Sequence, residues 1–307
     1  MGACESGRSP GKNTFSSQNS QPQYSLIKSI DAHKNKIASL IELSSSNIAT
    51  GSYDKTIKIW NVYNDFYIKE IIEEGYVFCL LEFKPNELLS GTSSNNIQLW
   101  DINSNKIIRK FEGHSLWVNC LVKCDDNYFA SCSNDSDIKI WEYNSGQCKN
   151  TLKGHTDCIL ALIKLNDGKL CSGSTDLTIK IWTWEDNMCV LTLEGNNEWV
   201  KCLCQLKNGY ILSGSNDKNI KVWEQDKIFG VLIGHSSSVR ALCPIKDNIF
   251  ASGSFDKTIK IWNINTQQCI KTLEGHTSNV TGIIYHRTGI LISCSNDHTI
   301  KLWQLNL

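Results

Sequence analysis

The chain consists of short apolar, β-branched runs that alternate with clusters of Gly, Asn and Asp. Thr258–Trp262 is one such run, and Asn166–Gly168 and Asn208–Gly209 are two of the polar clusters between runs. The periodicity of an amphipathic helix is nearly absent. Short β-branched runs bounded by turn-forming residues are typical of strands, so the pattern predicts an all-β protein.

The tryptophan that ends this run recurs at a nearly constant interval. It occupies seven positions: Trp60, Trp100, Trp141, Trp182, Trp223, Trp262 and Trp303. The intervals are 40, 41, 41, 41, 39 and 41 residues, and a fixed period of this length is typical of a repeat architecture. A second position lies 27 residues before each tryptophan, as His33 does before Trp60. Variation in repeat length therefore falls between one tryptophan and the next repeat.

Two further features share this register. Gly-His pairs occur at Gly113-His114, Gly154-His155, Gly234-His235 and Gly275-His276. An aspartate lies six residues before the tryptophan in six repeats, at Asp54, Asp135, Asp176, Asp217, Asp256 and Asp297. Gly-His, Asp and Trp at this period resemble the WD40 repeat, and the resemblance covers residues 24–307. It implies a seven-bladed β-propeller with four strands per blade. The expected repeat units are 31–70, 71–110, 112–151, 153–192, 194–231, 233–272 and 274–307.

The segment Tyr24–Ile30 predicts a strand outside any complete repeat. It aligns with Gln268–Leu273, which precedes a Gly-His pair and which the resemblance makes the outermost strand of the preceding blade. The seventh repeat lacks such a strand, because the chain ends at Leu307. We therefore expect Tyr24–Ile30 to complete the last blade and close the ring, which removes an open sheet edge.

Composition and charge argue against several classes of function. The 307 residues are 41% hydrophobic and 20% charged, as in soluble globular proteins. Lys+Arg and Asp+Glu both number 31, so no overall basic charge favours nucleic acid. No secretory signal is present, and no apolar run approaches the roughly 20 residues of a membrane-spanning helix.

The 14 cysteines raise the question of disulfides or a metal site. Most of them lie within apolar runs, as Cys120, Cys202 and Cys243 do. No two pairs have the Cys-x-x-Cys spacing of a zinc site. We therefore expect buried, reduced thiols in a reducing compartment, with no metal and no other cofactor.

His, Ser or Thr, and Asp recur together, as they would in a hydrolase triad. An active site needs one such set, whereas five repeats carry it. The resemblance implies instead a buried hydrogen-bond network in each blade, from Trp to Ser or Thr, then to His and Asp. The five sets are His33, Thr50, Asp54 and Trp60; His114, Ser131, Asp135 and Trp141; His155, Ser172, Asp176 and Trp182; His235, Ser252, Asp256 and Trp262; and His276, Ser293, Asp297 and Trp303. No catalytic or nucleotide-binding motif is found, so we expect no enzymatic activity.

Two repeats depart from this pattern. Glu73 replaces the histidine and Ser94 the aspartate in the second, and Asn196 replaces the histidine in the fifth. One interpretation is neutral drift, since losing one network costs on the order of 1–3 kcal/mol. The other is that the second blade is adapted for a partner.

In the WD40 family, partners commonly dock on the top face, around the mouth of the central channel. The resemblance places there the residues three and five positions after the histidine position, and the residue before the aspartate. The candidates for binding are Tyr53, Tyr76, Phe78, Trp117, Leu160, Trp199, Lys201, Arg240 and Phe255. Tyr76, Phe78, Trp117, Cys158, Leu160 and Trp199 should form a sector over blades 2 to 5. None of the carried-over positions is acidic, which favours an acidic or phosphorylated segment. The alternative is that some rings pack inward between blades.

Residues 1–23 are rich in Gly, Ser, Asn, Gln and Pro, and their composition predicts disorder. Met1–Ser6 matches the N-myristoylation pattern with Gly2 as acceptor, and the neighbouring Cys4 is a candidate for palmitoylation. A chance match is the alternative, expected in roughly 1% of sequences. One myristoyl chain binds membrane only marginally, so Cys4 would supply the second signal. This predicts a cytoplasmic protein held at the cytoplasmic face of a membrane.

These features predict a non-catalytic scaffold or adaptor, a monomeric propeller within a larger complex, that binds a protein or peptide on its top face. Two alternatives remain: a G-protein β-like signalling subunit, or a substrate-recognition subunit of a complex such as a ubiquitin ligase. The first would need an N-terminal coiled coil, and residues 1–23 show no heptad pattern.

Overall fold

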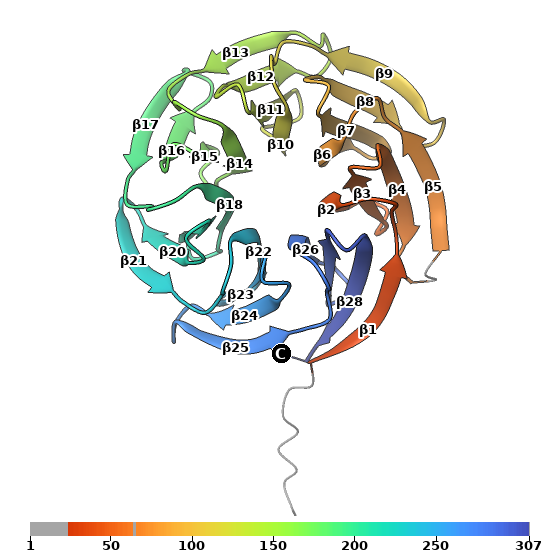
Figure 1. Cartoon of the computed structure of the whole chain (residues 1–307). Helices are drawn as coiled ribbons and strands as arrows, with labels where there is room; N and C mark the ends of the chain where they lie inside the picture. The colour runs from red at the N-terminus through yellow and green to blue at the C-terminus, as the bar shows by residue number, and fades with distance from the viewer. Residues whose placement is uncertain (1–23, 64–65, 307) are drawn as a thin grey trace, which may run out of the picture.

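A computed structural model describes residues 24–63 and 66–306. These residues form 28 strands and no helix. The strands make seven antiparallel sheets of four strands each, arranged as blades around a central axis (Figure 1). The fold is therefore an all-β, seven-bladed propeller, as the repeats predict. The described part of the chain contains no helix that could cross a membrane.

Each blade runs from an inner strand to an outer strand (Figure 1). Blades 1 and 2 consist of β2 (Ile37–Glu42), β3 (Ile48–Ser52), β4 (Thr56–Asn61), β5 (Phe66–Ile72), then β6 (Val77–Lys84), β7 (Glu87–Thr92), β8 (Ile97–Asp101) and β9 (Lys106–Phe111). Blades 3 and 4 consist of β10 (Val118–Lys123), β11 (Tyr128–Ser133), β12 (Ile138–Glu142), β13 (Cys148–Leu152), then β14 (Ile159–Lys164), β15 (Leu170–Ser174), β16 (Ile179–Thr183) and β17 (Met188–Leu193). Blades 5 and 6 consist of β18 (Val200–Gln205), β19 (Ile211–Ser215), β20 (Ile220–Glu224), β21 (Lys227–Leu232), then β22 (Val239–Lys246), β23 (Ile249–Ser254), β24 (Ile259–Asn263) and β25 (Gln268–Leu273). Blade 7 consists of β26 (Val280–Tyr285), β27 (Ile290–Ser295), β28 (Thr299–Leu305) and β1 (Tyr24–Asp31).

The strand β1 closes the ring. It pairs antiparallel with β28, from Tyr24 opposite Leu305 to Asp31 opposite Thr299. Lys301 Nζ donates a 2.6 Å hydrogen bond to Ser29 Oγ across this pair. The expectation that the N-terminal strand completes the last blade is confirmed, so the first and last strands of the propeller lie in one sheet.

The hydrophobic core lies between neighbouring blades rather than at the centre of the ring. Each of seven buried clusters joins side chains of two adjacent blades. Between blades 1 and 2, for example, Ile57 and Ile59 pack with Leu80, Leu88 and Trp100. Both faces of each sheet are covered, which explains why β3 is buried at every position instead of alternating.

Glycine in the second strand allows neighbouring blades to approach closely. A Cβ atom added at Gly51 would lie only 2.5 Å from Val77 Cγ1 of the next blade. The same relationship joins Gly173 to Val200 at 2.4 Å. A side chain at these glycines would force the blades apart, so this packing requires the missing side chain.

The cysteines are free thiols throughout the described residues. Most are buried or half-buried in strands, but Cys148, Cys189 and Cys269 are exposed. These three lie on the outer strands β13, β17 and β25, so the expectation of buried thiols is wrong for them. Each of these outer strands is exposed where it begins and buried only at its last residue, Leu152, Leu193 or Leu273, and the three cysteines lie near the exposed end.

Candidate partner-binding face

The antiparallel strands divide the connections between two faces of the ring. Connections from the first to the second strand of a blade, and from the third to the fourth, lie on the bottom face. Connections from the second to the third strand, and from each blade to the next, lie on the top face. His114 comes just before β10 and Asp135 just after β11, so both belong to the top face.

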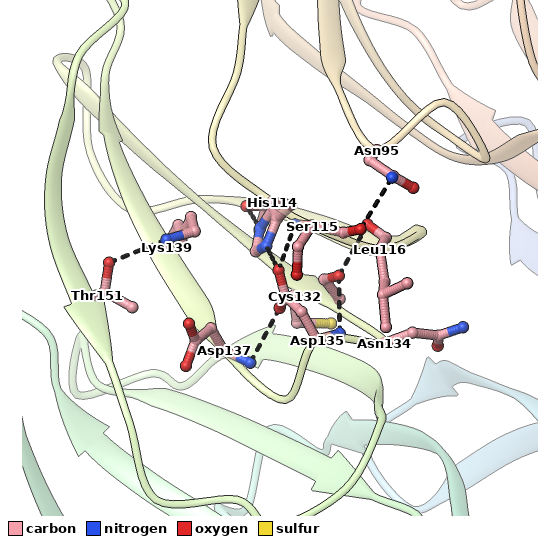
Figure 2. Close-up of polar contacts among 12 residues, drawn as sticks. Asn95, His114, Ser115, Leu116, Cys132, Asn134, Asp135, Asp137, Lys139 and Thr151 are labelled. Carbon is pink, nitrogen blue, oxygen red and sulfur yellow. Dashed lines mark hydrogen bonds and ion pairs between the residues drawn. The ribbon is translucent and has the colours of Figure 1, made fainter.

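A chain of hydrogen bonds supports the top-face loops of blade 3. Trp141 Nε1 donates to Ser131 Oγ at 2.8 Å, and Ser131 Oγ lies 2.7 Å from His114 Nε2. His114 Nδ1 lies 2.8 Å from Asp135 Oδ2, which also accepts the backbone N–H of Ser115 (Figure 2). A carboxylate only accepts, so the imidazole proton sits on Nδ1 and the Ser131 hydroxyl donates to Nε2.

The same chain of contacts occurs in blades 1, 4, 6 and 7. The hydroxyls that accept the indole N–H there belong to Thr50, Ser172, Ser252 and Ser293, at 2.9, 2.8, 2.7 and 2.9 Å. These hydroxyls lie 2.8, 2.8, 2.7 and 2.8 Å from Nε2 of His33, His155, His235 and His276. The distances from imidazole to carboxylate are 2.9, 2.7, 2.7 and 2.8 Å. The structure therefore brings together the residues of all five expected networks.

The burial of the hydroxyls argues for a structural role of these networks. Thr50, Ser131, Ser172, Ser252 and Ser293 are fully buried, with 0% of each residue exposed. No substrate reaches these hydroxyls as it would reach a catalytic serine. Each network instead anchors the loop before the first strand of its blade to the loop after the second.

The carboxylates of these networks stay ionised far into acid. Burial raises the pKa of Asp135, but its hydrogen bonds, first of all the one from His114, outweigh burial and lower the pKa to about 2. The same opposing causes hold the pKa values of Asp54, Asp176, Asp256 and Asp297 well below their usual range.

A second set of hydroxyls, which the sequence analysis missed, holds the aspartate loops in place. Ser133 Oγ accepts the backbone N–H of Asp135 at 3.1 Å and donates to the Leu116 carbonyl at 3.0 Å. The equivalent residues are fully buried in all seven blades: Ser52, Thr92, Ser133, Ser174, Ser215, Ser254 and Ser295. Their constant place two residues before the aspartate position is the signal that could have revealed them.

Blade 2 retains part of the network with different chemistry. Trp100 Nε1 donates to Glu73 Oε1 at 2.7 Å, and the Ser90 hydroxyl donates to the same oxygen. Burial raises the pKa of Glu73, while these two hydrogen bonds lower it, and the net shift is upward. Among the described residues, Glu73 Oε2 and both side-chain amide atoms of Gln98 have no partner. In blade 2 the indole N–H therefore keeps a hydrogen bond, but the contact between an imidazole and an aspartate carboxylate is lost.

Blade 5 loses the network at the histidine position. Asn196 is buried, and neither of its side-chain amide atoms finds a partner within the described ranges. Asp217 Oδ2 instead accepts from Lys221 Nζ at 2.7 Å. The indole N–H of Trp223 still donates to Ser213 Oγ at 2.8 Å.

Four aromatic rings form a continuous series on the top face of blades 1 to 3. Tyr76 stacks on Tyr53 with centroids 5.1 Å apart, Tyr53 meets the edge of Phe78 at 5.4 Å, and Phe78 stacks on Trp117 at 5.3 Å. Tyr76 is 40% and Trp117 45% exposed, whereas Tyr53 and Phe78 are half-buried. We call these four residues the aromatic series. It begins one blade earlier than the expected sector, because Tyr53 bridges two blades.

Trp199 stands apart from this series. It is 45% exposed, and Lys201 Nζ lies 4.5 Å from the centroid of its ring. No ring contact joins it to the aromatic series among the described residues. Leu160 and Cys158, which the expected sector placed between Trp117 and Trp199, are half-buried. The expected sector is therefore divided into two exposed aromatic areas.

Arg240 lies where the central channel opens onto the top face. It lines both the channel, of about 300 Å³, and a neighbouring top-face cavity of about 270 Å³. The cavity has three aromatic walls, Tyr53, Phe78 and Phe255, and a second cation, Lys36. Phe255 and Arg240 are half-buried. A cavity with both aromatic walls and cations suits an apolar side chain next to a negative group.

The top face also carries an exposed residue outside the three positions per repeat that the family resemblance places there. Leu116 is next to Trp117 and is strongly exposed. Its position two residues after the histidine was not among those carried over from the family.

No group of three or more His, Cys, Asp or Glu side chains in the described ranges is arranged to hold a metal ion. The candidates for lipidation, Gly2 and Cys4, lie outside the described residues.

The comparison with known proteins agrees with the repeats. A family model for the WD domain, G-beta repeat, matches residues 24–61, 105–142, 146–183, 187–224, 226–263 and 267–304. The second repeat, with Glu73 and Ser94, falls outside these matches, yet the structure shows it as a complete blade. Loss of two family residues therefore hides this repeat without altering its fold.

Curated relatives share only parts of the chain. The DENN domain and WD repeat-containing protein SCD1 of Arabidopsis thaliana is 29% identical over 30% of this chain and 8% of its own length. Nuclear distribution protein PAC1 of Komagataella phaffii is 30% identical over 29% of this chain and 18% of its own. Transcriptional corepressor LEUNIG_HOMOLOG of Arabidopsis thaliana is 37% identical over 24% of this chain and 10% of its own. The chain thus aligns with a minor part of each relative. By its six repeat matches and its seven blades, the chain belongs to the WD40-repeat family.

Proposed function

We propose that this chain is a non-catalytic interaction scaffold that binds a protein or peptide segment on its top face. The observation that carries the proposal is the aromatic series, in which Tyr76 and Trp117 are exposed at the two ends of a stacked array. Large exposed rings cost free energy in water unless a partner covers them, and tyrosine and tryptophan are enriched among interface anchors.

Rigid support makes these rings suitable as anchors. The half-buried Tyr53 and Phe78 hold Tyr76 and Trp117 in place by stacking, so little side-chain entropy is lost when a partner binds. Histidine networks restrain the loops of blades 1 and 3, and the backbone N–H of Tyr76 in blade 2 donates to Ser93 Oγ at 2.9 Å. The surface is therefore largely preformed.

The charge of the site favours a negatively charged partner. Lys36, Lys201 and Arg240 lie among the aromatic residues, and the residues that line the cavity and the channel include no Asp or Glu. Arg and Lys form strong charge-assisted hydrogen bonds with carboxylates and phosphates. We propose an acidic or phosphorylated segment that also carries an apolar anchor.

Family membership supports the general role but not a pathway. WD40 propellers generally act as interaction scaffolds, and the names of the relatives refer to nuclear distribution and to transcriptional corepression. These roles differ from one another, so the partner of this chain has to be found by experiment. The cellular location is likewise a proposal: a cytoplasmic adaptor tethered to a membrane through Gly2 and Cys4.

Affinity purification with mass spectrometry tests the proposed function. The tagged chain is compared with a Trp117→Ala/Trp199→Ala variant and with Tyr63→Ala. Tyr63 is a matched control, since it is an exposed ring on the bottom face, after β4. We expect specific partners to be retained by the wild type and by Tyr63→Ala and lost from the double variant. Equal recovery with all three proteins would show that the aromatic top face is not the binding site.

A further inference from the structure

Two cations meet at the mouth of the central channel. Lys201 lies on β18 of blade 5 and Arg240 on β22 of blade 6, and both line the channel. Arg240 Nη1 donates a hydrogen bond of 3.2 Å to the backbone carbonyl oxygen of Lys201. This bond between neighbouring blades holds the guanidinium beside the backbone of Lys201, whose ammonium group lies over the Trp199 ring.

The charge of Arg240 extends across the ring axis. Burial raises the pKa values of Cys79, Cys202 and Cys294, and the positive charge of Arg240 acts in the opposite direction on all three. These thiols belong to blades 2, 5 and 7. Arg240 lines both the channel and the top-face cavity, so its guanidinium lies at the channel mouth, where a segment crossing the channel would pass.

Lys201 and Arg240 have no acidic partner in the part of the chain that the structure describes, and neither forms an ion pair with Asp or Glu there. Burial and the neighbouring Arg240 charge lower the pKa of Lys201 to about 8. Two like charges held together at a half-buried site are unfavourable, so an anion between them would gain from both.

The nearest acidic residues on the top-face loops are engaged in local contacts. Asp157 Oδ1 accepts the backbone N–H of Cys158 at 2.7 Å, and Glu198 Oε2 lies 3.5 Å from Asn216 Nδ2. Both residues precede an inner strand; Asp157 contacts its own loop, and Glu198 contacts the loop after the second strand of its blade. The channel mouth therefore presents a positive centre surrounded by aromatic and amide side chains.

We propose that Lys201 and Arg240 form a phosphate-binding subsite for a phosphorylated side chain of the partner segment. This inference rests on the proposed function and makes it more specific. A phosphoryl group carries about −1.5 to −2 charges at pH 7 and three acceptor oxygens, so it matches two cations. One carboxylate would leave a positive charge uncompensated. The cavity lined by Tyr53, Phe78 and Phe255, which shares Arg240, takes an apolar side chain next to the phosphorylated residue.

Degenerate peptide pools test the subsite directly. Three immobilised pools of one length and composition differ only at the central residue, which is phosphoserine, serine or glutamate. Binding of the full chain is measured for wild type, Arg240→Gln, Lys201→Gln and Lys169→Gln. Lys169 is the matched control, since it is a half-exposed lysine next to a bottom-face turn and pairs with Asp167. Thermal melting of each variant reports whether it is folded.

The inference predicts that the phosphoserine pool binds at least about tenfold more tightly than the serine pool. Arg240→Gln and Lys201→Gln should each remove most of this difference, and Lys169→Gln should keep it. Equal binding of all three pools, or a phosphate preference that survives Arg240→Gln, would overturn the subsite. In that case the proposed function still stands if Trp117→Ala/Trp199→Ala weakens binding of every pool. Inositol hexakisphosphate is added as a competitor. If the chain binds it more tightly than the phosphoserine pool, the ligand of the subsite is a soluble phosphate and not a phosphorylated peptide.

Discussion

Trp100 donates its indole N–H to Glu73 in blade 2, at a distance of 2.7 Å. The same N–H also reaches the Ser90 hydroxyl, at 3.1 Å. In the five blades with a histidine, the equivalent indole donates to a serine or threonine hydroxyl and to no carboxylate. A buried carboxylate thus takes over the position of a neutral imidazole. It satisfies the indole and the Ser90 hydroxyl with one oxygen and leaves its second oxygen without a partner among the described residues.

Replacing Glu73 by glutamine should stabilise the protein at neutral and alkaline pH. The pKa of Glu73 is raised in the folded chain, so the wild type loses stability as the pH rises through this folded pKa. The glutamine of Glu73→Gln carries no charge and avoids this loss. We therefore expect the free energy of unfolding of the variant to exceed that of the wild type by about 1 kcal/mol at pH 8 and to differ little from it near pH 4.5. Melting curves across this pH range measure the effect.

Glu74→Gln is the control for this prediction. Glu74 is exposed and pairs with Lys110 at 2.9 Å, and exposed pairs contribute less than about 1 kcal/mol. A stabilisation of Glu73→Gln that does not depend on pH would show that charge burial is not its cause.

Acid should weaken the five histidine networks together. The pKa of Asp135 is lowered to about 2 in the folded chain and lies near 3.9 in an unfolded one, so its contribution is present above pH 4 and lost as the pH falls toward 2. Asp135→Asn should cost about 1–3 kcal/mol at pH 7, and its difference from wild type should shrink toward pH 2. Urea unfolding at several pH values measures both.

Asp226→Asn provides the comparison, since Asp226 is exposed between β20 and β21. It should follow the wild-type stability at every pH. If the free energy of unfolding of Asp135→Asn stays below that of the wild type by the same amount from pH 7 down to pH 2, the proposed contribution of the carboxylate is contradicted.

Removing β1 should destabilise the whole ring. Two truncations are compared, one lacking residues 1–23 and the other lacking residues 1–31. Only the longer one removes the strand that covers β28, and the exposed edge and lost packing should cost at least about 2 kcal/mol. Calorimetric melting of both proteins measures the difference, and identical melting temperatures would mean that β1 adds nothing to closure.

Much of this fold could be predicted because its determinants are local in the sequence and repeated. The interval between tryptophans predicted seven blades, and the Gly-His pairs marked the tight approach to the indole. A Cβ added at Gly234, for instance, would come within 2.9 Å of Trp262 Cη2. Even the substitution at Glu73 did not prevent recognition of its blade, since Trp100 kept the register.

The details of the candidate site depend on contacts between blades, which the repeat does not encode. The stacking of Tyr53 on Tyr76 joins blades 1 and 2, and the hydrogen bond from Arg240 to Lys201 joins blades 6 and 5. The place of a residue within its repeat predicts that it lies on the top face, but the direction of its side chain depends on a neighbour in another repeat. This is why the sequence predicted an aromatic sector over blades 2 to 5, whereas the stacked rings span blades 1 to 3.

Lipidation stays a prediction, since Gly2 and Cys4 lie outside the described residues. Gly2→Ala should abolish association with membranes, because no myristoyl group can then be attached. Cys4→Ser should leave weak, reversible binding, as expected for a single acyl chain. Fractionation of cells that express each variant measures the outcome, and a wild type as soluble as Gly2→Ala would refute the tether.

Hydrogen exchange of the chain with and without a partner captured by affinity purification tests the central claim most directly. If the partner binds the top face, amides of segments 114–118, 196–200 and 236–239 should exchange more slowly in the complex. Amides of the bottom-face segments 165–169, 206–210 and 246–249 should be unchanged. Protection confined to these bottom-face segments would contradict the account.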